Sequence, residues 1–289
     1  MVNTKASNCK GQNMESPSTT ETNNPSFKVA LALALSNYTL AGRGRLRREI
    51  GKYVLNHLSS PIEVDLWGAR VKLYPHSNQC DFKILMKPNH YCKKEMSFLD
   101  EALDSEGAVY FDIGANSGFF SLNAAVNARK KRRVFSFEPN PEMVRRIKEK
   151  FENQKNQAVL ASTEWTLCPY ALGDEDGTSY LTIPNGNYGE AHLSELKEGI
   201  EVQLKSLQSV VEEHSIEKID ALKIDVEGYE DRIMKQLFEI MDKGLWPKAI
   251  IIEYVNKSSW EWDPVQEALS NGYIEAFKTR NNIALIYQD

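Results

Sequence analysis

From Gly107 onward, short apolar runs alternate with segments that carry apolar residues at helical spacing. The runs have the length and the β-branched or aromatic composition of buried strands. Such alternation predicts a parallel sheet with helices on both faces. The expected strands cover residues 109–113, 133–138, 165–172, 219–225 and 249–255, and the expected helices lie near 117–128, 140–153, 229–242 and 263–271.

Two further strands are expected at about 273–279 and 282–287, separated only by the short Arg280–Asn281 turn. So short a connection makes them antiparallel neighbours. With the five strands above, they predict an α/β fold with a seven-stranded, Rossmann-like sheet. We expect residues 107–289 to form this domain.

The residues before Gly107 follow other patterns. Residues 1–26 hold 13 Ser, Thr or Asn residues and no Leu, Ile or Phe, so we expect a disordered tail that cannot bury enough apolar surface to order itself. Residues 27–106 predict a small helical and β extension. It comprises a helical pattern from about 27 to 58, strand-like alternation around Val64–Leu66, Val71–Leu73 and Phe82–Ile84, and a helix from about 91 to 103.

Composition narrows the class of protein. The chain has 35 basic and 40 acidic side chains among 289 residues, a formal net charge of −5, which argues against a protein that coats nucleic acid or a membrane surface. The four cysteines form no CxxC pair, so the common zinc and redox motifs are excluded. The longest apolar run, Val29–Leu35, is far too short for a membrane span. We expect a cytoplasmic protein, and nothing in the sequence sets its oligomeric state.

The first buried strand ends in Asp112, and a turn from Gly114 to Gly118 leads from it into a helix. This arrangement places backbone amides and a helix N-terminus at the carboxyl edge of the sheet, where doubly wound folds bind nucleotides. The dinucleotide motif GxGxxG is absent. Asp112 would repel a pyrophosphate but suits a ligand with an amino group or a sulfonium charge. S-adenosylmethionine carries both, and we expect it as the cofactor.

A second acidic residue supports a nucleoside ligand. Glu138 ends the second strand, twenty residues after Gly118, and Pro139 follows it. A carboxylate at this position can accept hydrogen bonds from both hydroxyls of a ribose. The turn and the acid together predict a cofactor site, whereas a glycine turn alone would be weak support for one.

Four segments, in this order, resemble the FkbM family of S-adenosylmethionine-dependent methyltransferases: Phe111–Ser121, Phe137–Pro141, Ala171–Asp174 and Leu222–Glu230. The resemblance covers about residues 107–255. It implies a class I methyltransferase fold and O-methylation of a hydroxyl on a sugar, a glycolipid or a secondary metabolite. It does not fix the acceptor.

The same resemblance implies roles for individual residues. Glu138, beside Pro139, would hold the ribose. Ala171 and Leu172 would flank the adenine together with Asp174, although simple core packing explains the two apolar residues equally well. The methionine end of the cofactor would be cradled by Asp112, Gly114, Asn116 and Gly118.

Strand alternation places Lys223, Asp225 and Glu227 on one side of the fourth strand, with Asp225 near its carboxyl end. Buried charges are costly, so these residues form either a catalytic group or a structural ion pair. Glu253 ends the fifth strand and would lie next to Asp225. The two carboxylates could bind Mg²⁺, or could divide general-base and positioning roles. The sequence leaves both possibilities open.

His192 is the histidine nearest the expected site, and its neutral imidazole could take the acceptor proton. A histidine of a surface loop, without a catalytic role, is the simpler interpretation. The basic runs Arg43–Arg48 and Arg129–Arg133 could contact phosphate or RNA, but solvated helix faces and helix ends explain them more simply. We therefore expect a small-molecule or glycan hydroxyl acceptor and no nucleic acid. The alternatives are a cofactor-binding protein without catalysis and a methyltransferase acting on RNA or protein.

Overall fold

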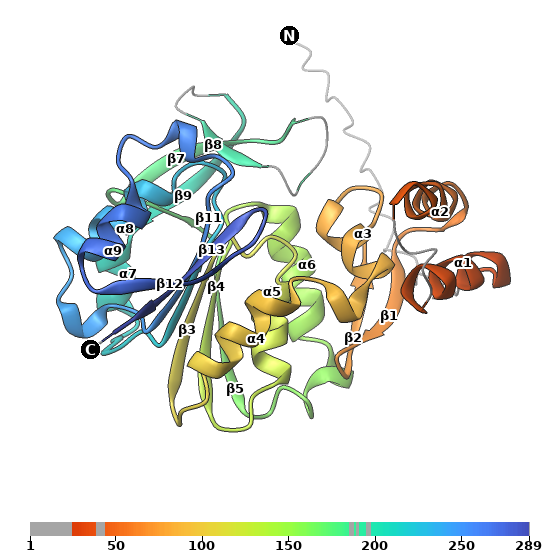
Figure 1. Ribbon diagram of the computed structural model, residues 1–289, viewed down its shortest axis with the longest axis horizontal. Helices are drawn as coiled ribbons and strands as arrows, with labels where there is room; N and C mark the ends of the chain where they lie inside the picture. Colours follow the sequence, from red (N-terminus) through yellow and green to blue (C-terminus); the bar gives the residue numbers. More distant parts are fainter. Residues whose placement is uncertain (1–24, 39–43, 185–187, 189–190, 195–197, 289) are drawn as a thin grey trace, which may run out of the picture.

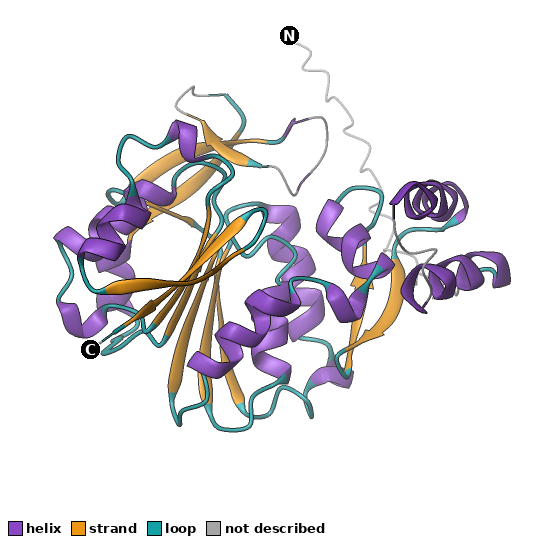
Figure 2. Cartoon of the chain, in the orientation of Figure 1, coloured by secondary structure: helices purple, strands orange, loops and turns teal. Residues whose placement is uncertain are grey.

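The computed structural model describes residues 25–38, 44–184, 188, 191–194 and 198–288. Its centre is a seven-stranded sheet with helices on both faces, which confirms the predicted α/β architecture (Figures 1 and 2). One strand, β13, runs antiparallel to both of its neighbours, and the other neighbouring strands are parallel. In order across the sheet the strands are β12 (Tyr273–Lys278), β13 (Asn282–Tyr287), β11 (Ala249–Glu253), β10 (Ala221–Ile224), β3 (Ala108–Ile113), β4 (Arg132–Phe137) and β5 (Thr163–Cys168).

Each face of the sheet has its own apolar core. In β3, Tyr110 packs in one core while Val109, Phe111 and Ile113 pack in the other, as the two-residue period of a strand requires. The first core lies under α4 (Lys93–Ala102), α5 (Phe119–Val126) and α6 (Pro141–Phe151). The second lies under α7 (Leu207–Glu213), α8 (Glu230–Glu239) and α9 (Pro264–Ser270).

The N-terminal extension packs into the first of these cores (Figure 1). It consists of α1 (Phe27–Tyr38), α2 (Gly44–His57), the antiparallel pair β1 (Ile62–Leu66) and β2 (Ala69–Leu73), α3 (Gln79–Met86) and the 3₁₀ turn η2 (Pro88–His90), and α4 follows it. The predicted helices and the strands around Val64–Leu66 and Val71–Leu73 are confirmed.

The predicted strand around Phe82–Ile84 is wrong, because this segment is helix α3. The Asn78 side chain accepts hydrogen bonds from the amides of Cys80 and Asp81 at 2.8 and 3.1 Å, and this N-cap starts the helix. Asp81, Ile84 and Leu85 have the i, i+3, i+4 spacing of one helical face, and Met86 is also buried. Alternation over a few residues did not distinguish this spacing from a strand.

The predicted strand 165–172 is wrong in its second half. Pro169, which has no amide proton to donate, follows the last residue of β5. Beyond it the chain enters a separate four-stranded sheet, which the sequence did not predict as a unit. Its strands, in the order β6-β9-β7-β8, are β6 (Ala171–Gly173), β7 (Gly177–Thr182), β8 (His192–Ser194) and β9 (Ile200–Ser206).

The predicted tail falls almost wholly outside the described residues, since residues 1–24 and Arg43 are not among them. The domain boundaries at 27–106 and 107–289, and the cytoplasmic location, stay predictions. Across the described ranges, no helix has the length and apolar character needed to cross a bilayer.

Candidate active site

A cavity lies at the carboxyl edge of β3, β4 and β10, between this edge and the four-stranded sheet. One part of its wall is apolar and includes Phe137, Tyr170, Leu172 and Leu193. The other part carries the polar residues of the three strand ends, which are Asn116, Glu138, Asp225 and Glu227. We call this the first cavity.

The turn after β3 approaches the end of β10 so closely that only glycine fits. Gly114 has φ +73°, and a Cβ there would lie 1.8 Å from the carbonyl oxygen of Asp225. Gly118 also has φ +73°, but its added Cβ would meet the Ile147 side chain of α6 at 3.0 Å. Gly114 therefore brings the turn against the end of β10, whereas Gly118 serves the packing of α5 on α6.

The side chain of Asp112 does not line the first cavity. It is fully buried, and its Oδ2 accepts hydrogen bonds from the amide and hydroxyl of Ser121 at 3.0 and 2.6 Å. Its Oδ1 lies 3.7 Å from Lys223 Nζ. Burial raises the pKa of Asp112, and the Lys223 charge opposes that rise. Asp112 thus anchors the start of α5 and holds Lys223, a positioning role that the sequence did not separate from ligand contact.

Glu138 does line the first cavity, and its two carboxylate oxygens are each bound by a backbone amide. Asn116 N donates to Oε2 at 2.7 Å, and Asn140 N donates to Oε1 at 2.9 Å. A carboxylate has about four lone-pair sites, so one on each oxygen remains for a ribose hydroxyl. Burial raises the pKa of Glu138 to about 7, despite these two hydrogen bonds. Pro139 lines the cavity beside it.

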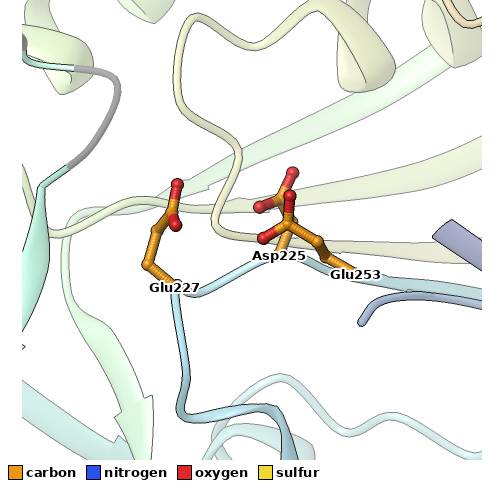
Figure 3. A group of neighbouring side chains, drawn as sticks. All are labelled: Asp225, Glu227 and Glu253. Atoms are coloured by element: carbon orange, nitrogen blue, oxygen red, sulfur yellow. The ribbon is translucent and has the colours of Figure 1, made fainter. Parts of the chain in front are cut away.

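Three carboxylates gather where β10 and β11 end. Oxygen atoms of Asp225, Glu227 and Glu253 lie within 4.8 Å of one another (Figure 3). Burial, together with the charges of Asp225 and Glu227, raises the pKa of Glu253 to about 9. The predicted proximity of Asp225 and Glu253 is therefore present, and it arises because Ile224 and Ile252 are paired in register.

Lys223 lies under this cluster and is almost fully buried. Its Nζ is 3.2 Å from Asp225 Oδ2. Desolvation would lower the pKa of Lys223, but the opposite charges of Asp225 and Asp112 outweigh it, and the pKa is raised. Lys223 therefore stays charged and fixes both aspartates.

The loop after β10 is held by Glu230, which the sequence analysis quoted but did not assign a role. The buried Glu230 carboxylate accepts hydrogen bonds from Val226 N at 3.0 Å, Gly228 N at 3.1 Å and Trp260 Nε1 at 2.9 Å. These bonds stabilise a backbone in which Glu227, with φ 56°, is left-handed. The Glu227 side chain in turn accepts from Asn256 Nδ2 at 2.9 Å.

The remaining predicted residues divide between the cavity wall and the surface. Ala171 and Leu172 line the first cavity, as does His192 from β8. Asp174 does not: its side chain is 59% exposed and lies 3.9 Å from Arg232. The basic run Arg129–Arg133 lies at the opposite edge of the sheet, where β4 begins.

A second cavity, of about 620 Å³, adjoins the first. The two share Asn116, Asp225 and Glu227, and the second alone contains Glu253. Its far wall comes from the N-terminal extension and includes Tyr91. In the extension, the sequence offered only the basic run Arg43–Arg48 as a possible phosphate contact, because nothing local in residues 44–92 indicates which sheet edge they will face.

Comparison with known proteins identifies the chain at this point. The profile described as the methyltransferase FkbM domain matches residues 112–271, more than half of the sequence. The chain belongs to the FkbM methyltransferase family. This FkbM methyltransferase has the class I fold, its cofactor is S-adenosylmethionine, and the four predicted motif segments lie within or across the matched range.

Solved structures with the same general architecture are distant in sequence. The precorrin-6y C5,15-methyltransferase of Geobacter metallireducens GS-15 is 15% identical, with 68% of this chain and 89% of that chain covered and a TM-score of 0.34. A putative rRNA methylase of Clostridium thermocellum is 11% identical, with 68% and 96% covered and a TM-score of 0.38. The SAM-dependent methyltransferase of Agrobacterium tumefaciens is 9% identical, with 80% and 71% covered and a TM-score of 0.39. No curated protein matches the chain significantly. At these identities none of the named substrates carries over to this FkbM methyltransferase.

Proposed function

We propose that this FkbM methyltransferase transfers a methyl group from S-adenosylmethionine to a hydroxyl of a sugar, a glycolipid or a secondary metabolite. The observation that carries the proposal is the junction of the two cavities at Asn116, Asp225 and Glu227. A donor in the first cavity and an acceptor in the second would meet beside a carboxylate. Catalysis would then rest mainly on holding the two reactants in line.

The first cavity suits the cofactor in both of its parts. Its apolar wall, with Phe137, Tyr170 and Leu172, would enclose the adenine, and Glu138 would accept hydrogen bonds from the ribose hydroxyls. The methionine end would then lie near the turn at Gly114 and Asn116, toward the second cavity. Asp174 is left out of this proposal because its side chain is exposed and lies away from the cavity wall.

S-adenosylmethionine, held by Glu138 and the turn at Gly114 and Asn116, would supply an electrophilic methyl group to the acceptor oxygen, and its sulfur would keep the electron pair of the carbon–sulfur bond. The acceptor proton passes to Asp225, which acts as general base. Lys223, 3.2 Å from Asp225, fixes the orientation of the carboxylate. Glu227 and Glu253 position the acceptor by hydrogen bonds. His192 lines the first cavity only, which places it on the cofactor side of the junction.

The carboxylate cluster also fits a divalent cation. Three carboxylate side chains within 4.8 Å provide the oxygen donors that Mg²⁺ takes, and Asp225, Glu227 and Glu253 would hold it. Such an ion, when bound, would supply Lewis-acid stabilisation of the acceptor oxygen. The Lys223 ion pair already offsets part of the same negative charge. A chelator distinguishes the two arrangements: with a metal it lowers the rate and added Mg²⁺ restores it, and without one it has no effect.

The test of the proposal is Asp225→Asn, which keeps the shape and removes the charge. Loss of a general base costs about 10²–10⁴-fold in rate, so turnover, measured as S-adenosylhomocysteine release with a hydroxyl acceptor, should fall by this amount. Cofactor affinity should stay within about twofold, because the lost interaction acts in the transition state. The matched control is Asp65→Asn on the exposed surface of β1, which should leave both quantities unchanged.

A near-parent rate in Asp225→Asn would contradict the role of this residue and make His192 the next candidate. Release of S-adenosylhomocysteine only in the presence of RNA or of protein would show that this macromolecule, and not a small hydroxyl compound, is the acceptor. Cofactor binding without methyl transfer to any acceptor would show that the chain binds the cofactor but is not an enzyme.

A further inference from the structure

The second cavity has walls of opposite charge. The wall at the sheet edge carries Asp225, Glu227 and Glu253. The wall from the N-terminal extension carries three cations, which are Arg47 of α2, Lys83 of α3 and Lys87 just after α3. These cations come from two helices, because Lys87 is the C-cap residue of α3, and the fold brings them together around one cavity in a chain whose net charge is −5.

The three cations have no partner among the described residues. No ion pair or hydrogen bond there involves the side chains of Arg47, Lys83 or Lys87. Other arginines of the chain are paired: Arg145 and Arg146, for example, both bind Glu142 at 2.8 Å. Three like charges around one cavity repel one another unless an anion lies between them.

We propose that the acceptor of this enzyme carries a phosphate group, which binds to Arg47, Lys83 and Lys87 while its hydroxyl lies beside Asp225. This inference rests on the proposed methyl transfer and adds the class of acceptor. A phosphate monoester carries about −1.5 to −2 charges at neutral pH. This charge balances three cations better than the single negative charge of a carboxylate does. The arginine fork adds paired hydrogen bonds to phosphate oxygens.

The opposite charges also set the orientation of the acceptor. The phosphate is repelled by Asp225 and Glu227 and attracted by the extension, so it cannot bind at the methyl-transfer end. The hydroxyl end is neutral and meets the carboxylates, where its proton is removed. A cavity of about 620 Å³ holds a phosphorylated polyol or sugar, either free or as the head group of a lipid.

The cofactor has a carboxylate of its own, which the same cations could bind instead. The structure favours the acceptor, because Arg47, Lys83 and Lys87 line only the second cavity, and Glu138 and the apolar residues line only the first. The two possibilities differ in a measurable way: cations that bind the acceptor do not change the affinity for the cofactor.

The experiment uses the full chain saturated with S-adenosylhomocysteine and glycerol 3-phosphate as the probe, with binding followed by ³¹P NMR. We expect saturable binding that Lys83→Gln/Lys87→Gln weakens at least tenfold, with cofactor affinity kept within twofold. Lys130→Gln/Lys131→Gln, in the exposed basic run at the opposite sheet edge, is the matched control and should bind the probe like the parent. Arg47→Gln tests the same wall if the double variant does not fold.

Turnover supplies the second readout and separates the sources of phosphate. If the acceptor is a free molecule, we expect faster methylation of glycerol 3-phosphate than of glycerol. If it is a lipid head group, we expect faster methylation of phosphatidylglycerol vesicles than of phosphatidylcholine vesicles. Absence of saturable probe binding, equal binding by the double variant, or a tenfold loss of cofactor affinity in that variant would each overturn the proposal. Failure of Asp225 as the base is distinguishable, because Asp225→Asn should bind the probe at least as tightly as the parent.

Discussion

The side-chain amide of Asn78 donates a hydrogen bond of 2.7 Å to Asn116 Oδ1, and so joins the N-terminal extension to the turn that follows β3. The same Asn78 caps α3 with its carbonyl oxygen. A second hydrogen bond joins the same two segments, since the Ser117 hydroxyl donates to Asp81 Oδ1 at 2.5 Å. The turn after β3 and the extension that forms a wall of the second cavity are therefore fixed to each other.

Asn78→Ala should loosen that connection and lower cofactor affinity. Loss of the cap and of one buried hydrogen bond should reduce the free energy of unfolding by about 1–3 kcal/mol. We expect S-adenosylhomocysteine affinity, measured by calorimetry, to fall by about fivefold, a change of about 1 kcal/mol. Asp263→Ala removes a comparable cap from α9, away from both cavities, and should reduce stability without changing affinity. Equal affinities in the two variants would show that the link does not shape the cofactor site.

Cofactor affinity should depend on the ionisation of Glu138. Ribose hydroxyls donate to the ionised carboxylate, so protonation removes an acceptor. With a pKa of about 7 in the free protein, affinity should fall as the pH drops below that value, by up to about tenfold per unit. The charge of Asp112 raises the pKa of Glu138 and the charge of Lys223 lowers it, and neither residue is substituted in this experiment.

Glu138→Gln should show at least about tenfold weaker binding at neutral pH, because charge-assisted hydrogen bonds contribute roughly 1.5–3 kcal/mol each. Its affinity should also be independent of pH across this range. Calorimetric titration of both proteins with S-adenosylhomocysteine checks the prediction. A flat profile for the parent would rule out Glu138 as the titrating contact.

Gly114→Ala should abolish cofactor binding by moving the turn. The added Cβ would lie 1.8 Å from the Asp225 carbonyl oxygen, and the backbone is left-handed at this position. Gly244→Ala is the matched control, since no atom lies within 4 Å of its added Cβ. The control should be neutral or more stable by about 0.4–1 kcal/mol. Thermal unfolding and cofactor titration of both variants give the answer, and normal binding by Gly114→Ala would disprove the close approach.

Lys223→Met should destabilise the fold by about 3–5 kcal/mol, because it leaves the buried Asp112 without its cation. Among the described residues, none donates a hydrogen bond to Asp112 Oδ1 that could replace the lost charge. The pKa of Asp112 would then rise further above its unfolded value, so the lost stability should be largest at neutral pH and should diminish as the pH falls and Asp112 is protonated.

Urea unfolding at several pH values measures this effect. Lys130→Met, whose exposed side chain lies 3.8 Å from Asp104, should cost no more than about 1 kcal/mol at any pH. An equal cost for both substitutions would mean that Lys223 is not needed to neutralise Asp112.

The sequence by itself determined the parallel sheet, the glycine turn and the carboxylates at three strand ends. These features are local: a buried strand is a short apolar run, and the residue after it lies at the sheet edge. The proximity of Asp225 and Glu253 followed as well, because parallel neighbours end at the same edge. The sequence could not show that Asp112 lies behind the cavity wall, since strand position alone does not reveal which atoms a buried side chain contacts.

Only the tertiary structure decided what faces the site from outside the sheet. The helical conformation of α3, the separate sheet that covers the first cavity, and the position of Arg47, Lys83 and Lys87 all depend on contacts between distant segments. Two hydrogen bonds hold the extension next to the turn after β3: one joins Asn78 to Asn116, and the other joins Asp81 to Ser117. Local patterning cannot encode such pairings, because the free energy that selects them comes from burial and hydrogen bonds formed only when both segments are folded.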